Sequence, residues 1–387
     1  MKKLLLAATV ATLAMNAAQA APTLYGKLSV TLDNIDNNGF KDESVTKVNS
    51  NASRIGVKGE EKLTDNLSAV YLAEWEIWAD GDDVFKNRNR FVGIKSNGVA
   101  TLKVGQYDSY FKTAAGNNQD IFNDHNELDM TKVLVGEDRL TNVIGFETDK
   151  KLLGGLAFNI MFQQGENAAT SATAKTSTTS LAGVTKETTV VTNYGLKDAR
   201  DGFGDGVSAS LTYENKDMGL AAAVAANRAI ASKFNAYDLS GIYTDAVRVT
   251  GSLDLGAMGA SGLVLGALWQ TAKPTDDVVA VITTTKETNK PDTVKNNSFK
   301  GLKEDAYGVT AAYAIPSTPV KLKAQYISAT TEVDGMKDRQ QDLYGVGADY
   351  QINKQARFYG IVAQQKRDWL TKDDKKTNIG LGMEYNF

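Results

Sequence analysis

The sequence contains no cysteine, a single histidine and five prolines among its 387 residues. Disulfides are therefore excluded, and the usual nitrogen and sulfur donors of a zinc site are missing, so we expect neither a metal nor a cofactor. Past the N-terminal region there is no run of about 20 apolar residues, which excludes a transmembrane helix. The formal net charge of −3 provides no basic excess, which argues against nucleic acid as a partner.

The N-terminus has the pattern of a secretory signal. Lys2 and Lys3 precede a short apolar stretch from Leu4 to Met15, and Ala18-Gln19-Ala20 forms a small-x-small cleavage site. We therefore predict that residues 1–20 are a cleaved signal peptide and that residues 21–387 form one exported domain.

The dominant pattern after residue 21 is an alternation of apolar and polar residues in segments of about ten, the length of a tilted membrane-crossing strand. It is clearest in segments 24–33, 247–255, 320–327 and 377–387. In the last of these, Ile379, Leu381 and Met383 share one face, and Asn378, Gly380 and Glu384 share the other. We interpret the apolar face as meeting lipid and the charged face as lining an aqueous lumen. The prediction is an all-β protein, a transmembrane antiparallel β-barrel.

The connections between these segments alternate between short and long, as in barrels with tight periplasmic turns and free external loops. The short ones are 63–66, 96–98, 214–217, 315–319 and 352–355, and the long ones are 34–52, 107–138, 164–206, 229–245 and 272–305. Counting strands between them gives sixteen, and an even number brings both termini to the periplasmic side. Residues 167–192, rich in Thr, Ala and Ser, are expected to form a surface loop with little to order it.

Five segments, in this order, carry a resemblance to a known family: LYGKLSV at 24–30, SRIGVKGEEKL at 53–63, RNRFVGIKSNGVATLKVGQYDS at 88–109, DLYGVGADYQI at 342–352 and the terminal GLGMEYNF. The chain resembles the Gram-negative general porins, which are trimeric and sixteen-stranded. The resemblance implies a homotrimer in the outer membrane, surrounded by lipid and lipopolysaccharide, and a water-filled channel for passive diffusion of ions and small hydrophilic solutes. Phe387 is similar to the family's C-terminal aromatic, which the outer-membrane assembly machinery recognises.

The resemblance also implies a constriction of the pore. In the family, the loop after the fifth strand folds into the barrel and presents carboxylates to basic side chains on the opposite wall. The matching loop here is 107–138, and its acidic candidates are Asp120, Asp124, Glu127 and Asp129. The basic candidates are Lys27, Arg54, Arg88, Arg90 and Arg139, with Lys58 and Lys86 as weaker ones. An arginine facing lipid at mid-membrane costs about 2–4 kcal/mol, which favours the lumen for arginines on strands. The loop departs from the family in lacking its common Pro-Glu-Phe signature.

Other functions stay open at this point. A substrate-selective channel, or a barrel whose loops act as an adhesin or phage receptor, would share the same pattern. A barrel enzyme would need a nucleophile and a base, and the sequence offers His125 alone, in a polar loop, so we predict no catalytic residues. Asp198, Asp201 and Asp205 resemble a calcium loop only in composition, because their spacing differs from that pattern.

Overall fold

The computed structural model describes residues 21–81, 85–116, 118–122, 124–179, 185–276, 279–288 and 290–387. The predicted signal peptide, residues 1–20, lies outside the described residues. Within the described part of the chain, none of the helices combines the length and the apolar character that a membrane span requires.

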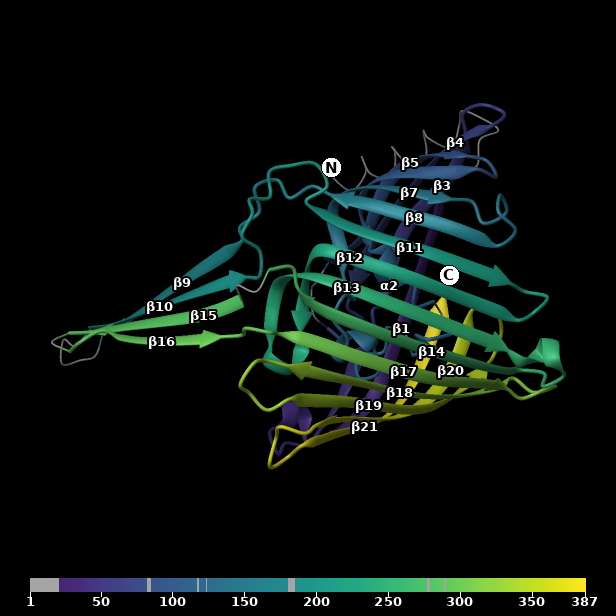
Figure 1. Ribbon diagram of the computed structural model, residues 1–387. Helices are drawn as coiled ribbons and strands as arrows, with labels where there is room; N and C mark the ends of the chain where they lie inside the picture. The colour runs from purple at the N-terminus through teal and green to yellow at the C-terminus, as the bar shows by residue number, and fades with distance from the viewer. Residues whose placement is uncertain are drawn as a thin grey trace, which may run out of the picture.

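Almost all regular structure is β-strand (Figure 1). The strands of the large sheet are β1 (Thr23–Asp36), β2 (Val45–Ser50), β3 (Arg54–Lys62), β4 (Leu67–Ile77), β5 (Phe85–Ser96), β6 (Ala100–Asp108), β7 (Arg139–Thr148), β8 (Leu156–Gln163), β11 (Gly206–Asn215), β12 (Leu220–Phe234), β13 (Leu239–Asp254), β14 (Leu263–Pro274), β17 (Lys303–Ala314), β18 (Val320–Glu332), β19 (Arg339–Gln351), β20 (Ala356–Arg367) and β21 (Lys375–Asn386). The short helices are η1 (Asn38–Phe40), α2 (Tyr110–Thr113), η2 (Met130–Lys132), η3 (Asn235–Tyr237) and η4 (Leu255–Met258).

The large sheet closes on itself as a barrel of sixteen strands. β2 and β3 both pair with β1, at Val30–Ile35 and Thr23–Lys27 respectively, so they are two halves of one membrane-crossing strand interrupted at residues 51–53. Strand β1 also pairs with β21, and neighbouring strands run antiparallel around the ring. The predicted fold class and strand number are therefore confirmed.

The burial of side chains is the reverse of that in a soluble sheet. On β1, Leu24, Leu28 and Leu32 are 60%, 40% and 55% exposed, whereas Thr31 and Asp33, on either side of Leu32, are 1% and 0% exposed. The same alternation recurs around the ring, for example at Ile379 and Leu381 of β21. Such an apolar outer surface is stable against acyl chains, and the polar residues face inward, as predicted.

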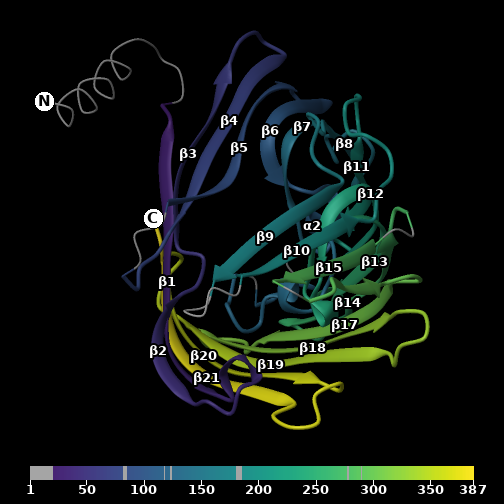
Figure 2. The same ribbon diagram turned by 90° about the vertical axis from the view of Figure 1, so that its left-hand side faces the viewer.

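The described residues of 109–138, which we call the inner segment, lie inside the barrel. They follow β6, the fifth strand when β2 and β3 are counted as one, and they include α2, which Figure 2 shows within the ring of strands. Phe111 N donates to Ser208 of β11, and the Gln341 side chain of β19 donates to Lys132 O at 2.7 Å. The segment is held by apolar packing as well, because Leu128, Met130, Val133 and Leu134 form a core with wall residues Leu268, Ile327 and Leu343.

A second, four-stranded sheet projects from one end of the barrel (Figure 1). It comprises β9 (Ser171–Thr179), β10 (Thr185–Tyr194), β15 (Val279–Glu287) and β16 (Thr293–Ser298), with β10 and β15 as its central pair. The expectation of an unordered loop over 167–192 is therefore wrong. Its threonines and valines favour extended backbone, and a partner strand nearly a hundred residues away supplies the hydrogen bonds.

Candidate functional site

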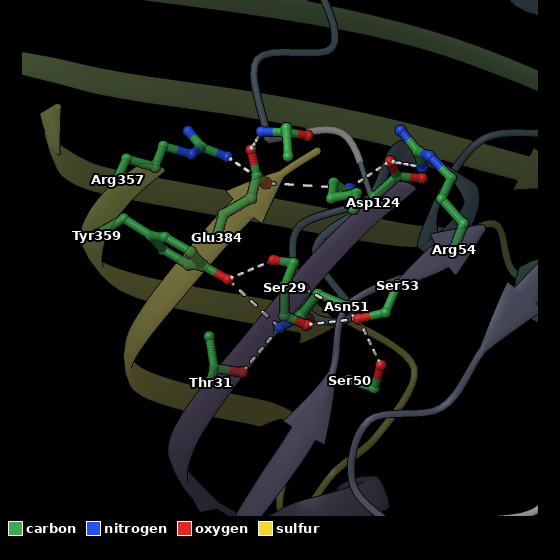
Figure 3. A network of polar contacts seen from close by, with 12 residues as sticks. Ser29, Thr31, Ser50, Asn51, Ser53, Arg54, Asp124, Arg357, Tyr359 and Glu384 are labelled. Carbon is green, nitrogen blue, oxygen red and sulfur yellow. Dashed lines mark hydrogen bonds and ion pairs between the residues drawn. The ribbon is translucent and has the colours of Figure 1, made fainter. Parts of the chain in front are cut away.

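One carboxylate of the inner segment binds three cations of the barrel wall. Asp124 Oδ2 lies 2.8 Å from Lys27 Nζ on β1 and 2.6 Å from Arg54 Nη1 on β3, and its Oδ1 lies 3.6 Å from Arg88 Nη2 on β5. We call these four residues the Asp124 cluster. Figure 3 shows the contact between Asp124 and Arg54. Three strands thus converge on one loop residue.

Two glutamates of β4 complete the wall side of this cluster. Arg88 Nε contacts Glu74 Oε1 at 2.6 Å, and Arg88 Nη1 lies 3.5 Å from Glu76. Tyr25 donates its hydroxyl to Glu74 at 2.8 Å. Neither glutamate was among the predicted site residues, although the parity of β4 could have found them, since Glu76 pairs with Arg54 and Glu74 lies two residues away on the same face.

The local fold explains why the tip of the inner segment reaches this point. At the interruption between β2 and β3, Ala52 takes a left-handed conformation with φ 47°. The side chain of the neighbouring Asn51 accepts a hydrogen bond from Asn126 N at 3.0 Å, and the Asn126 side chain donates to Ser50 O at 2.9 Å. These bonds fix the residues beside Asp124 against the wall, so the carboxylate is held in place by more than its charge.

The charges of the cluster keep Asp124 ionised. Burial by itself raises the pKa of Asp124, but the combined positive charges of Lys27, Arg54 and Arg88 outweigh burial and hold that pKa below its usual range. The expectation was of acidic residues facing a basic wall across an open gap. At Asp124 the two sides are instead in direct contact.

A second network continues from the cluster around the wall. Arg357 of β20 contacts Asp349 at 2.7 Å and Glu384 at 2.9 Å, and Lys323 of β18 contacts Asp349 at 3.0 Å. Glu384 also lies 4.0 Å from Lys27, which joins the two networks (Figure 3). A cavity of about 20 Å³, room for roughly one water molecule, lies beside these groups. The alternation had placed Lys323 and Glu384 on the polar face without assigning them a role.

Arg90 does not face the lumen, and its assignment to the basic wall is wrong. On β4, Trp75 pairs with Asn87 of β5. Ala73, two residues away on β4, pairs with Arg90, which is three residues away from Asn87 on β5. This β-bulge adds one residue to β5 and reverses the parity beyond it. Arg90 therefore shares the outer face with Val92, which is 61% exposed, and it donates to the Gln106 side chain at 2.8 Å.

Arg139 lies in a separate cluster at the base of the inner segment. Its Nη2 is 3.2 Å from Asp108 Oδ1, and its Nε donates to Asn89 at 2.6 Å. Lys112 of α2 contacts the same Asp108 at 3.3 Å. The structure thus brings together three of the five predicted basic residues around Asp124 and places Arg139 beside a different carboxylate.

The other predicted acidic residues do not contact the predicted basic wall. Asp120 is half-buried, and desolvation together with the charges of Asp129, Glu137 and Asp124 raises its pKa. Glu127 forms an ion pair with Lys376 of β21 at 2.5 Å. Asp129 caps η2, accepting a hydrogen bond from Thr131 N at 2.8 Å. An irregular loop has no period, so the sequence could not tell Asp124 from these three.

His125 is buried, contrary to the expectation of a polar and unshielded position. Its Nδ1 accepts a hydrogen bond from Glu127 N at 3.2 Å, and its ring meets Tyr359 edge-on with centroids 6.3 Å apart. Burial lowers the pKa of His125 to about 4. Among the described residues, no hydroxyl or thiol group is hydrogen-bonded to this imidazole.

The aspartates around residues 198–205 do not form a metal site. Asp205 accepts hydrogen bonds from the backbone N–H groups of Gly165 at 2.9 Å and Gly202 at 3.2 Å. Across the described ranges, no three His, Cys, Asp or Glu side chains are grouped so that they could hold a metal ion.

Phe387 lies at the seam that closes the barrel. Its backbone exchanges two hydrogen bonds with Gly26 of β1, at 2.9 and 3.0 Å, and its ring stacks on Tyr385. The ring also covers Gly26 so closely that a Cβ there would clash with it. The position of the Phe387 ring therefore depends on a glycine in β1.

Comparison with known proteins gives consistent findings. The family model described as Gram-negative porin matches residues 6–369. A major outer membrane protein P.IB of Neisseria meningitidis serogroup B is 33% identical over 176 residues, which cover 43% of this chain and 51% of that protein. The Neisseria gonorrhoeae protein of the same name is 34% identical over 124 residues, covering 30% and 35% of the two chains. The matched stretch thus spans about half the length, or less, of these relatives.

Solved structures share the fold along nearly the whole chain. The anion-selective porin from Comamonas acidovorans has a TM-score of 0.63 at 17% identity and covers 95% of this chain and 99% of its own. Salmonella typhi OmpF, in complex with daunomycin, has a TM-score of 0.59 at 16% identity and covers 95% and 97%. At such identities the likeness establishes the architecture.

Proposed function

The chain belongs to the Gram-negative porin family, and on that premise we propose that it forms a water-filled channel through which ions and small hydrophilic solutes diffuse passively. It is a protein of the outer membrane. The observation that carries the proposal is the inverted burial of a closed barrel: leucines cover the outside while ionised side chains gather inside. A solute crossing such a lumen stays among polar groups.

We further propose that the inner segment narrows the channel. The Asp124 cluster fastens its tip to β1, β3 and β5, and the side chain of Arg248 on β13 binds Glu137 at its far end. A cavity of about 380 Å³ lies between residues 113–116, 118 and 119 and the wall around β11–β13, large enough for many waters. Solutes would pass beside this fixed segment under the influence of the surrounding charges.

The partners follow from the family and are also proposals: a homotrimer in the membrane, lipid and lipopolysaccharide around it, and the assembly machinery acting on the strand that ends at Phe387. No catalytic role is proposed for any residue. His125, the one imidazole, is held neutral inside a hydrogen-bonded loop.

Recording from the purified protein in a planar lipid bilayer tests the channel directly. We expect stepwise conductance that rises in proportion to salt concentration, with three equal steps per insertion if the trimer is correct. In liposomes, uptake of small sugars should rise linearly with their concentration. A plateau would indicate the substrate-selective alternative, and a bilayer that stays silent would contradict the proposal.

One observation favours a second role, as an adhesin or phage receptor. The sheet β9–β10–β15–β16 extends beyond the barrel, and all nine residues of its edge strand β9 are exposed. An edge strand offers unpaired backbone groups to another chain. Deleting residues 168–194 should leave conductance intact, and it should abolish surface binding if that role exists.

A further inference from the structure

Three basic side chains lie at the barrel end from which the second sheet projects, on three adjacent strands. Arg339 begins β19, Arg367 ends β20 and Lys376 lies at the start of β21. The residues two positions further into the barrel on each strand are buried polar groups: Gln341, Gln365 and Asn378. Since side chains two apart on a strand share a face, the three cations face the aqueous mouth and not the lipid.

Aromatic rings lie between these cations. The guanidinium of Arg339 is 4.0 Å from the centre of the Tyr237 ring and 5.4 Å from that of Trp369. Arg367 lies 5.5 Å from Trp369 and 4.2 Å from Phe40, and Lys376 Nζ is 5.9 Å from Phe40. We call this row the mouth ladder; its members are Phe40, Tyr237, Arg339, Arg367, Trp369 and Lys376.

Stacking of this kind orders the arginines without neutralising them. An aromatic ring packs against the flat face of the guanidinium. The guanidinium keeps its charge, and the N–H groups at its edge stay free to donate. Arg339 uses one such group on Ala236 O, at 2.7 Å. The Nε of Arg367 is buried and has no hydrogen-bond partner among the described residues.

The charge balance here differs from that of the Asp124 cluster. There, each arginine contacts one or more carboxylates. In the mouth ladder, Lys376 is paired with Glu127, but no carboxylate of the described residues lies within 4.0 Å of Arg339 or Arg367. The charge of Asp238 acts on Arg367, but that carboxylate is already paired with Lys233 at 2.6 Å. Two ordered and partly desolvated cations therefore lack a counter-charge, which is costly unless an anion binds.

We propose that the mouth ladder is a binding site for small anions that carry a phosphate or carboxylate group. The edge of a guanidinium matches both groups with two parallel hydrogen bonds. Because Arg339 and Arg367 both contact Trp369, an anion held between them lies against that indole. Because the three cations face the lumen, the ligand is a dissolved solute and not a lipid headgroup. The proposed anion binding does not depend on the proposed channel function. Only its consequence, a raised concentration of the anion at the channel entrance, rests on that function.

Titration of tryptophan fluorescence with inorganic phosphate, at constant ionic strength and in detergent, tests binding without any current. The chain has four tryptophans, and Trp369→Phe identifies the signal of the one in the ladder. We expect a saturable change for the unaltered protein. Affinity should weaken by about tenfold for each arginine replaced in Arg339→Gln and Arg367→Gln, as for loss of a charge-assisted hydrogen bond.

Lys337→Gln is the matched control, because it removes an exposed positive charge two residues from Arg339 that contacts no aromatic ring of the described residues. Its titration should equal that of the unaltered protein. An equal loss of affinity in Lys337→Gln would show a diffuse charge effect and overturn the site. So would the absence of a saturable response in the unaltered protein. Barrel integrity is read separately by circular dichroism. Normal conductance without phosphate binding would refute this inference alone, whereas binding without conductance would refute only the channel.

Discussion

Replacing Asp124 by Asn tests the central contact of the barrel interior. The change keeps the size of the side chain but removes a charge shared by Lys27, Arg54 and Arg88. At an effective dielectric constant of about 20, a pair of unit charges 2.7 Å apart interacts by about 6 kcal/mol before desolvation is subtracted. Measured losses on breaking one side of a buried pair are smaller, about 3–5 kcal/mol, and we expect a loss of that size.

The expected loss has a defined dependence on pH. The pKa of Asp124 is lower in the folded protein than in the unfolded chain, so the folded state gains stability wherever the carboxylate is ionised. That stability is complete well above pH 4 and is lost as the pH falls through the folded-state pKa. Unfolding by urea in detergent micelles, at pH 7 and below pH 4, measures it. The variant should differ from the parent at pH 7, and the difference should shrink on acidification.

The same substitution should change ion preference. It removes one negative charge from beside three cations of the lumen wall, so reversal potentials in a salt gradient should shift toward anions. Asp129→Asn is the control: it alters an acid of the same segment that caps η2, and because Asn caps as well as Asp, it should cost less than about 1 kcal/mol. If Asp124→Asn lost less than the control and left reversal potentials unchanged, the reasoning about the cluster would be refuted.

Three further predictions follow from single contacts. Arg88→Gln should shift the reversal potential and Arg90→Gln should not, because the β-bulge turns Arg90 outward; equal shifts would contradict the assigned parity. Since the pKa of His125 is about 4 in the folded protein, below its ordinary 6.5, protonation favours the unfolded chain, and stability should fall as the pH drops from about 6.5 to 4. His125→Gln should remove that part of the slope in urea unfolding curves, and an unchanged slope would count against it. Gly26→Ala should destabilise the β1–β21 seam through its clash with the Phe387 ring, and Phe387→Ala in the same chain should restore part of the loss; refolding yield followed by circular dichroism measures both, and equal yields for Gly26→Ala and the parent would refute the clash.

The sequence by itself determined the architecture, because alternation along a strand is a local property. A period of two places Leu24, Leu28 and Leu32 on one face whatever the strand pairs with, and its repetition predicts a barrel with lipid outside. The alternation of short and long connections then predicted sixteen strands. The inward position of Lys27, Arg54 and Arg88 followed from the same parity together with the family resemblance.

The tertiary structure decided what depends on distance across the barrel or on a single inserted residue. The bulge in β5 reversed the parity of Arg90, and no residue type announces it. Which acid meets the basic wall was fixed by the path of the inner segment, and that path depends on Asn51, Arg248 and Gln341 on separate strands. Residues 185–194 became a strand by pairing with residues distant in sequence, and residues 171–179 pair with that strand. Contacts between segments far apart along the chain leave no local pattern, so only the closed barrel could specify them.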